Sequence, residues 1–133
     1  DREEFQEESE VCYTSGACTL TRKEALNEIG LMEDLFLAYG EDKDWGWRAS
    51  MMGWQSIYVP SSQMLHRWSP TLGQTPRKFY FLEFERLLSI CKNYSKRTLL
   101  LLMPVFLIVE SWVLLHASVR GWFREKLQSY VWI

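Results

Sequence analysis

An acidic cluster in the middle of the chain has the residue types that acid–base chemistry needs. It reads Glu41, Asp42, Lys43 and Asp44, and Arg48 follows Asp44 by four residues. At that spacing Asp44 and Arg48 share one face of a helix, so we assign them to a structural ion pair. Asp42 lies about 200° around the helix from Asp44 and cannot share its partner. A carboxylate at a helix N-terminus can accept a proton from a hydroxyl, which makes Asp42 a candidate general base, with helix capping as the alternative.

Two other segments contain candidate binding residues. Ser15, Gly16 and Ala17 form a motif that on its own predicts only a turn. His66 opens a loop rich in Ser, Thr and Gly, where its ring can reach a bound ion or phosphate. No carboxylate near His66 has an obvious ligand spacing, so on the residues alone a metal role is the less favoured alternative. Tryptophans mostly pack in cores, and among Trp45, Trp47 and Trp68 we assign only Trp68 a binding role, through the apolar face of its ring.

Helices and short strands are expected to position these residues. A weak alternation predicts a strand over 11–17, and Thr21 with Glu24 has the spacing of a capping box for a helix over 22–29. Gly30 is placed to end that helix, and a second helix is expected from Glu41 to just before residue 53. Strands are predicted over 55–59 and 63–66, and Thr75, followed by a proline, should begin a helix that runs to about residue 93.

The C-terminal part is strongly apolar. Residues 98–117, interrupted by Pro104 and Glu110, would form a helix about 30 Å long, which predicts a membrane-associated helix, with a buried core helix as the alternative. Residues 120–133 combine aromatic and basic side chains in the manner of an interfacial helix.

The composition of the whole chain limits its class. A net charge of −2 gives no basic field for binding nucleic acid. The three cysteines lack a CxxC spacing and indicate a reducing compartment.

Taken together, these segments resemble the second half of the family 2 glycosyltransferases, in particular their rhamnosyltransferase-like members. The resemblance covers about residues 13–94. It rests on motifs that occur here, in the family's order, as Ser15-Gly16-Ala17, Arg22-Lys23, Gly30, Glu41-Asp42-Lys43-Asp44-Trp45, Arg48, Gly53-Trp54, Val59-Pro60, His66, Ser69, Thr71 and Gly73. The chain departs from the family pattern at Leu31-Met32-Glu33-Asp34, and at Glu83-Phe84-Glu85-Arg86 only the final arginine carries over.

The resemblance implies a fold and a site. The fold class would be α/β, the C-terminal half of a GT-A (Rossmann-like) domain followed by a hydrophobic helical membrane segment. Asp42 would be the catalytic base, and His66 would join a divalent metal, Mn²⁺ or Mg²⁺, that holds the donor diphosphate and whose site is incomplete in this chain. The remaining residues implied by the resemblance would bind substrate; they are Ser15, Gly16, Ala17, Glu41, Trp68 and Arg86.

The resemblance also implies an organisation and a setting. We expect an acidic lead over 1–10, a partial glycosyltransferase domain over 11–94, a membrane-associated helix over 98–117 and an interfacial helix over 120–133. The nucleotide-binding half is missing, so we expect a fragment, inactive alone, of an inverting enzyme for cell-surface polysaccharide synthesis. Its partners would be a nucleotide-sugar donor, a glycan or lipid-linked acceptor and a membrane, with the catalytic part on the cytoplasmic side. The rivals are a non-catalytic membrane-attached interaction module and a metal-dependent hydrolase.

Overall fold

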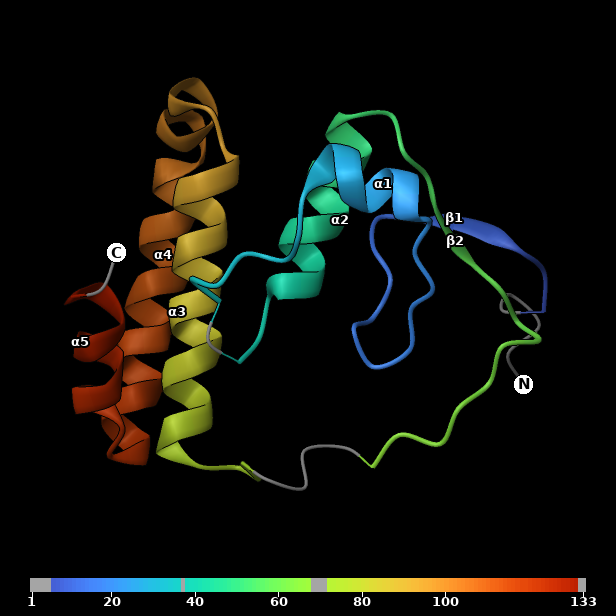
Figure 1. The fold of residues 1–133 in the computed structure, drawn as a ribbon. Coiled ribbons are helices and arrows are strands. Elements are labelled where there is room, and N and C mark those ends of the chain that lie inside the picture. Colours follow the sequence, from blue (N-terminus) through green and yellow to red (C-terminus); the bar gives the residue numbers. More distant parts are fainter. Residues whose placement is uncertain (1–5, 37, 68–71, 132–133) are drawn as a thin grey trace. The chain divides into compact units, whose positions relative to one another are not determined.

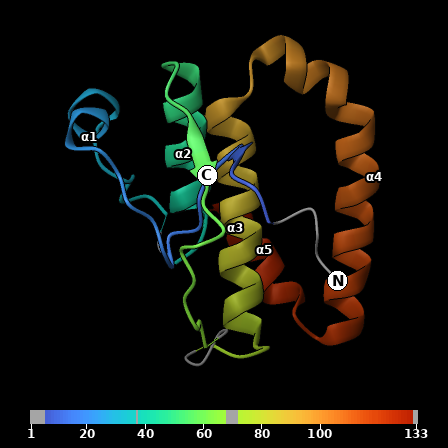
Figure 2. The same ribbon diagram turned by 90° about the vertical axis from the view of Figure 1, so that its right-hand side faces the viewer.

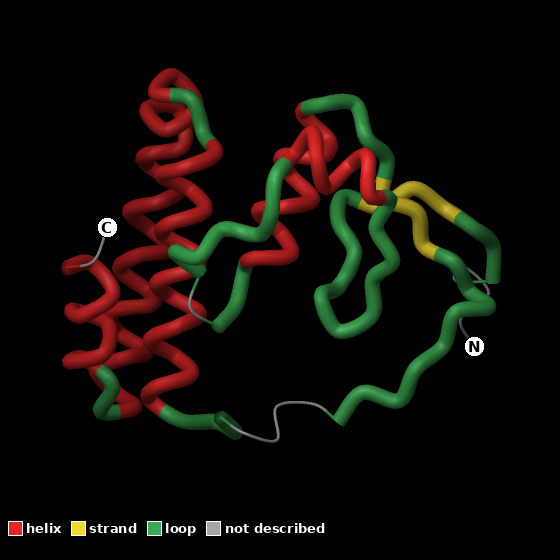
Figure 3. Tube along the Cα trace, viewed as in Figure 1, coloured by secondary structure: helices red, strands yellow, loops and turns green. Residues whose placement is uncertain are grey.

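The computed structural model describes residues 6–36, 38–67 and 72–131, and this part of the chain is mostly helical (Figures 1 and 3). It forms two compact units, residues 1–68 and residues 69–133. The elements, in chain order, are β1 (Ser9–Val11), α1 (Lys23–Ile29), α2 (Glu41–Met51), β2 (Ser56–Tyr58), α3 (Pro76–Asn93), α4 (Lys96–Arg120) and α5 (Phe123–Val131).

The first unit contains a small antiparallel sheet. β1 pairs with β2 in the register Ser9 with Tyr58, Glu10 with Ile57 and Val11 with Ser56. A parallel Rossmann-like sheet is therefore not evident in the described residues, and the α/β expectation is met only by two short strands. The strand predicted over 11–17 was wrong, because pairing stops at Val11 and a turn follows, and residues 63–66 form no strand.

Helices α1 and α2 enclose the apolar core of the first unit. Ala25 and Ile29 of α1 pack with Ala49 of α2, and two partly buried tryptophans, Trp45 and Trp54, cover this cluster. The end of α1 is at Gly30 as predicted, with φ of 85°. The predicted capping box was wrong, because α1 begins one residue later, after Arg22, and no side chain caps its first turn. Instead, the Leu26 amide donates a main-chain hydrogen bond to the Arg22 carbonyl at 3.1 Å in the first turn of α1.

Three helices make up the described part of the second unit, residues 72–131. α3 begins as predicted, with the Thr75 hydroxyl accepting a hydrogen bond from the Lys78 amide at 3.3 Å and Pro76 in the first turn. The Ser95 hydroxyl caps α4 in the same way, and α4 ends at Gly121 in the left-handed conformation that favours glycine. Pro104 lies inside α4, and Figure 2 shows that the helix bends after its first turns before it continues beside α5.

The apolar segment predicted over 98–117 lies within α4. Among the described residues, α4 is the one helix long and apolar enough to cross a membrane by length and composition, and only 6% of its most apolar stretch is buried. Within the range 120–133 the structure has the shorter helix α5, and its interfacial placement stays a prediction. An α4 so little buried is not the core helix of the second unit.

Candidate functional site

The loop of Ser15, Gly16 and Ala17 lies against the start of α2. The Gly16 amide donates a hydrogen bond to Asp42 Oδ2 at 3.0 Å, and the Lys43 amide donates to Asp42 Oδ1 at 2.8 Å. The Ser15 hydroxyl accepts a bond from the Ala17 amide at 3.3 Å, which holds the loop in its turn. Two of the segments singled out in the sequence, separated by 26 residues, are therefore brought together at one carboxylate.

A close contact between α2 and the preceding loop explains this placement. A Cβ atom on Gly46 would lie 2.4 Å from the Cβ of Tyr13, closer than side chains can approach. Only glycine allows residues 12 and 13 to pack so tightly on the middle of α2, two residues before Ser15. Gly46 was not predicted to matter, although a glycine inside a helix costs about 1 kcal/mol relative to alanine and so signals such a contact.

Asp44 and Arg48 form the ion pair expected from their spacing. Arg48 Nε donates to Asp44 Oδ2 at 2.9 Å, and the Asp44 side chain is fully buried. The same guanidinium donates to the carbonyl oxygens of Ile29, at 2.7 Å, and Leu31, at 2.8 Å, at the end of α1. Arg48 therefore joins α1 to α2, while Asp42 faces the Gly16 loop instead.

Glu41 contributes an unusual oxygen atom next to Asp42. Its Oε2 is buried and has no hydrogen-bond partner within the described part of the chain. A buried acceptor that lacks a donor is destabilising, and few occur in native proteins. The atom is left with the capacity to accept a hydrogen bond, and the substrate-binding role of Glu41 stays a prediction.

The predicted metal ligand stands apart from carboxylates. His66 is exposed in the loop after β2, and no three His, Cys, Asp or Glu side chains in the described ranges are grouped so that they could hold a metal ion. On their own these residues do not fit the divalent cation that the resemblance implies, and the metal role of His66 stays a prediction. Trp68, together with Ser69 and Thr71, lies outside the described residues.

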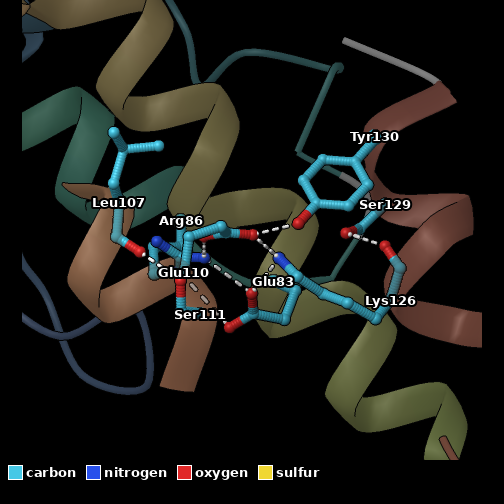
Figure 4. A network of polar contacts seen from close by, with 8 residues as sticks. All are labelled: Glu83, Arg86, Leu107, Glu110, Ser111, Lys126, Ser129 and Tyr130. Carbon is cyan, nitrogen blue, oxygen red and sulfur yellow. Dashed lines mark hydrogen bonds and ion pairs between the residues drawn. The ribbon is translucent and has the colours of Figure 1, made fainter. Parts of the chain in front are cut away.

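Arg86 belongs to the second unit and is held in a ring of alternating charges (Figure 4). Its Nη2 atom lies 2.7 Å from Glu83 Oε2 and 2.6 Å from Glu110 Oε2. Lys126 Nζ closes the ring, because it lies 2.7 Å from the same Glu83 oxygen and pairs with Glu110 on the other side. The Tyr130 hydroxyl also donates to Glu110. We call Glu83, Arg86, Glu110 and Lys126 the charge ring.

The charge ring joins all three helices of the second unit and is electrically neutral. Burial works against the charge of Arg86, but its hydrogen bonds to Glu83 and Glu110 outweigh that effect and raise its pKa. Burial and the hydrogen bond to Glu110 both raise the pKa of Tyr130. The guanidinium predicted to bind substrate is thus engaged by two carboxylates. Of its partners, Glu110 was visible in the sequence only as an acid within an apolar run.

Comparison with known proteins gives a partial relationship. No family model and no solved structure matches the chain. Over 77 residues it is 39% identical to N-acetylglucosaminyl-diphospho-decaprenol L-rhamnosyltransferase from two strains of Mycobacterium tuberculosis, CDC 1551 / Oshkosh and ATCC 25618 / H37Rv. The match covers 56% of this chain and 25% of each relative, so the chain spans about a quarter of the length of the curated relatives that it matches. The chain is therefore similar, over part of its length, to a glycosyltransferase.

Proposed function

We propose that the chain is the part of a membrane-associated glycosyltransferase that carries the catalytic base and contacts the acceptor. The observation that carries the proposal is the hydrogen bond from the Gly16 amide to Asp42. It joins two motifs that were selected independently in the sequence, and the partial similarity to a rhamnosyltransferase supports the same chemistry. The rest of the enzyme, including its donor pocket, would be supplied by other parts of a longer protein.

In this proposal Asp42 takes the proton of an acceptor hydroxyl. The resulting oxygen nucleophile forms a bond to the anomeric carbon of the donor sugar as the bond to the nucleoside diphosphate breaks, which inverts the configuration at that carbon. Two amides hold the Asp42 carboxylate in place, so it is ready before the acceptor arrives. The buried Oε2 atom of Glu41 would accept a hydrogen bond from a second hydroxyl and so orient the acceptor ring.

The acceptor would be a lipid-linked sugar. The name of the mycobacterial relatives describes transfer of L-rhamnose to an N-acetylglucosaminyl-diphospho-decaprenol. A chain with an apolar, exposed helix such as α4 suits an enzyme whose acceptor resides in a membrane. We therefore assign the parent protein to cell-surface polysaccharide synthesis, with a nucleotide sugar as donor and its catalytic part on the cytoplasmic side.

The test compares two isosteric substitutions in the full-length parent protein. Asp42→Asn should lower the turnover number by about 10²–10⁴-fold with little change in donor affinity, because the base is lost and the shape is kept. The matched control, Asp44→Asn, removes the same charge two residues away and should lower thermal stability while sparing turnover in the folded fraction. Transfer is followed by mass spectrometry of the glycosylated lipid, and donor affinity by calorimetry.

Three results would contradict the proposal. Transfer by Asp42→Asn at the wild-type rate would remove Asp42 from the chemistry. Donor breakdown that is independent of acceptor would indicate the hydrolase instead. A parent protein that binds neither donor nor acceptor would favour the non-catalytic interaction module.

A further inference from the structure

The second unit has its polar and apolar side chains arranged in the opposite sense to a water-soluble bundle. Lys126 and Ser129 of α5 are completely buried, and Glu110 of α4 is nearly so. Each of them has its partners inside the unit, through the charge ring or, for Ser129, through a bond to the Lys126 carbonyl at 2.7 Å. The side chains of Glu110, Lys126 and Ser129 thus point inward, while the exposed charges of α4 lie near its ends.

Large apolar side chains are exposed on the outward faces of the same helices, next to Arg124 and Gln128 on α5. On α5, Phe123, Leu127 and Val131 recur every four residues and form an exposed stripe. On α4, Leu101, Ile108 and Trp112 share one face and are 79%, 72% and 71% exposed, and Leu100 and Leu107 extend the exposed apolar surface to a second side. In water the hydrophobic effect favours the reverse arrangement, and a helix that is apolar on all sides is normally surrounded by apolar material. Lipid hydrocarbon provides such surroundings.

Cations flank α4 at both of its ends. Lys96 and Arg97 begin the helix, Arg120 ends it, and Arg124 follows at the start of α5. The Arg120 guanidinium lies over the ring of Trp122, 5.7 Å from its centre, and tryptophan is enriched at the level of lipid headgroups. Both ends of α4 are therefore complementary to anionic headgroups, and a charge difference between its ends that would orient a spanning helix is absent.

The neighbours of α4 are unsuited to crossing a bilayer with it. α3 runs antiparallel beside α4, since Phe79 lies near His116, with ring centres 6.5 Å apart, and Arg86 is bonded to Glu110. Six charged residues lie along α3: Arg77 and Lys92 are exposed near its ends, Arg86 is partly buried, and Lys78, Glu83 and Glu85 are buried. α5 has nine residues, about 14 Å of helix, which is less than half of the hydrocarbon thickness.

We infer that the second unit binds one leaflet of an anionic membrane, with α4 lying in the membrane plane and both of its ends on the same side. The charge ring holds the middle of α4 to the charged helix α3, so α4 can sink sideways among the lipids but cannot pass through them. This inference rests on the membrane association in the proposed function and goes beyond it by fixing the topology.

The first experiment locates the two ends of α4 in the full-length protein in sealed inner-membrane vesicles. One variant keeps Cys91, which is exposed near the end of α3, as its only cysteine. The other carries Ser118→Cys, near the end of α4, as its only cysteine. A membrane-impermeant maleimide should label both variants alike, either both before or both only after permeabilisation with detergent. Labelling of one before and the other only after permeabilisation would show that α4 spans and would overturn the inference.

The second experiment measures flotation with vesicles of phosphatidylglycerol and of phosphatidylcholine. Wild-type protein should float mainly with the anionic vesicles, and Ile108→Glu should lower the partition coefficient at least about tenfold. The matched control is Met51→Glu on α2 of the first unit, which changes a side chain that is 77% exposed. It should leave the partition coefficient unchanged. Failure to float, or flotation insensitive to Ile108→Glu, would overturn the inference.

A third variant separates this inference from the proposed function. Asp42→Asn should float and label as the wild type does, because Asp42 belongs to the first unit. An active enzyme that floats but is labelled at only one end of α4 before permeabilisation contradicts only the membrane topology. An active enzyme that fails to float contradicts the membrane association as well and leaves the catalytic assignment standing. A protein that passes both tests, and whose transfer survives Asp42→Asn, contradicts only the catalytic assignment.

Discussion

Two carboxylates separated by one residue meet different surroundings at the start of α2. Asp44 is buried against the guanidinium of Arg48, whereas Asp42 accepts bonds from the main-chain amides of Gly16 and Lys43. A helix turns about 100° per residue, so side chains two residues apart point in nearly opposite directions. This geometry leaves Asp42 to face the loop while Asp44 holds the fold.

The first prediction at the residue scale concerns Arg48. Arg48→Met should lower the free energy of unfolding by about 2–4 kcal/mol, because it leaves Asp44 buried without its charge partner and removes the donor from two carbonyls of α1. Thermal and urea denaturation measure the loss. Arg22→Met changes an exposed arginine in the same unit and serves as the control. Equal stability of the two variants would contradict the structural role of the pair.

The second prediction concerns Tyr130 and alkaline pH. The folded state raises the pKa of Tyr130 above its ordinary value of 10.0, because burial and the bond to Glu110 favour the neutral phenol. This contribution to stability is therefore complete below about pH 10 and is lost as the pH rises from there through the folded pKa. Tyr130→Phe should destabilise the protein by about 1 kcal/mol at pH 8, and its difference from wild type should shrink above pH 10.

Urea unfolding between pH 8 and pH 11.5 tests the Tyr130 prediction. Tyr13→Phe, which changes an exposed tyrosine of the first unit, controls for the general effect of alkali. A stability difference between Tyr130→Phe and wild type that is constant over this pH range would show that the hydroxyl is not linked to folding.

At the scale of elements, Gly46 decides how the loop before α1 packs on α2. Gly46→Ala should cost about 1–3 kcal/mol, because its methyl group would overlap Tyr13 and push residues 12–17 away from α2. The transfer activity of the parent should fall as well, since Gly16 would lose its bond to Asp42. Gly16→Ala is the control, because a Cβ there would lie 3.6 Å from Asp42, in ordinary contact. Similar stability of both variants, measured by thermal denaturation, would contradict the close contact.

The elements that were predicted correctly are those that residues close together in the sequence specify. α2 has acidic residues in its first turn, α3 begins with a Thr-Pro pair, and the ion pair of Asp44 and Arg48 follows from their four-residue spacing. The strand predicted over 11–17 was wrong because pairing with residues 56–58 and the contact at Gly46 are long-range. The approach of Gly16 to Asp42, and of Glu110 to Arg86 across 24 residues, has no local sequence signal either. The sequence therefore indicated candidate residues, whose roles stay predictions, but the way these residues are brought together could not be predicted from it.

At the scale of the whole molecule, the division into two units predicts the effect of a truncation. Ending the chain after Ser95 removes α4 and α5, and with them Glu110 and Lys126 of the charge ring. The amides of α3 should then lose protection from hydrogen exchange by at least about tenfold, whereas those of α2 should be unchanged, because the core of the first unit is intact. Equal loss of protection in α2 and α3 would show that the two units unfold as one.

The charge ring also determines how α4 is rotated about its own axis. Most side chains of α4 are apolar on every side of the helix, so apolar packing discriminates little between different rotations of α4 about its own axis. It also discriminates little between positions of α4 that differ by one turn along α3. Glu110 is its one acidic residue, and it meets Arg86, Lys126 and Tyr130 at only one angle and one height. A single buried carboxylate thus fixes the rotation and the axial position of an otherwise apolar helix, as isolated polar residues fix the register of coiled coils.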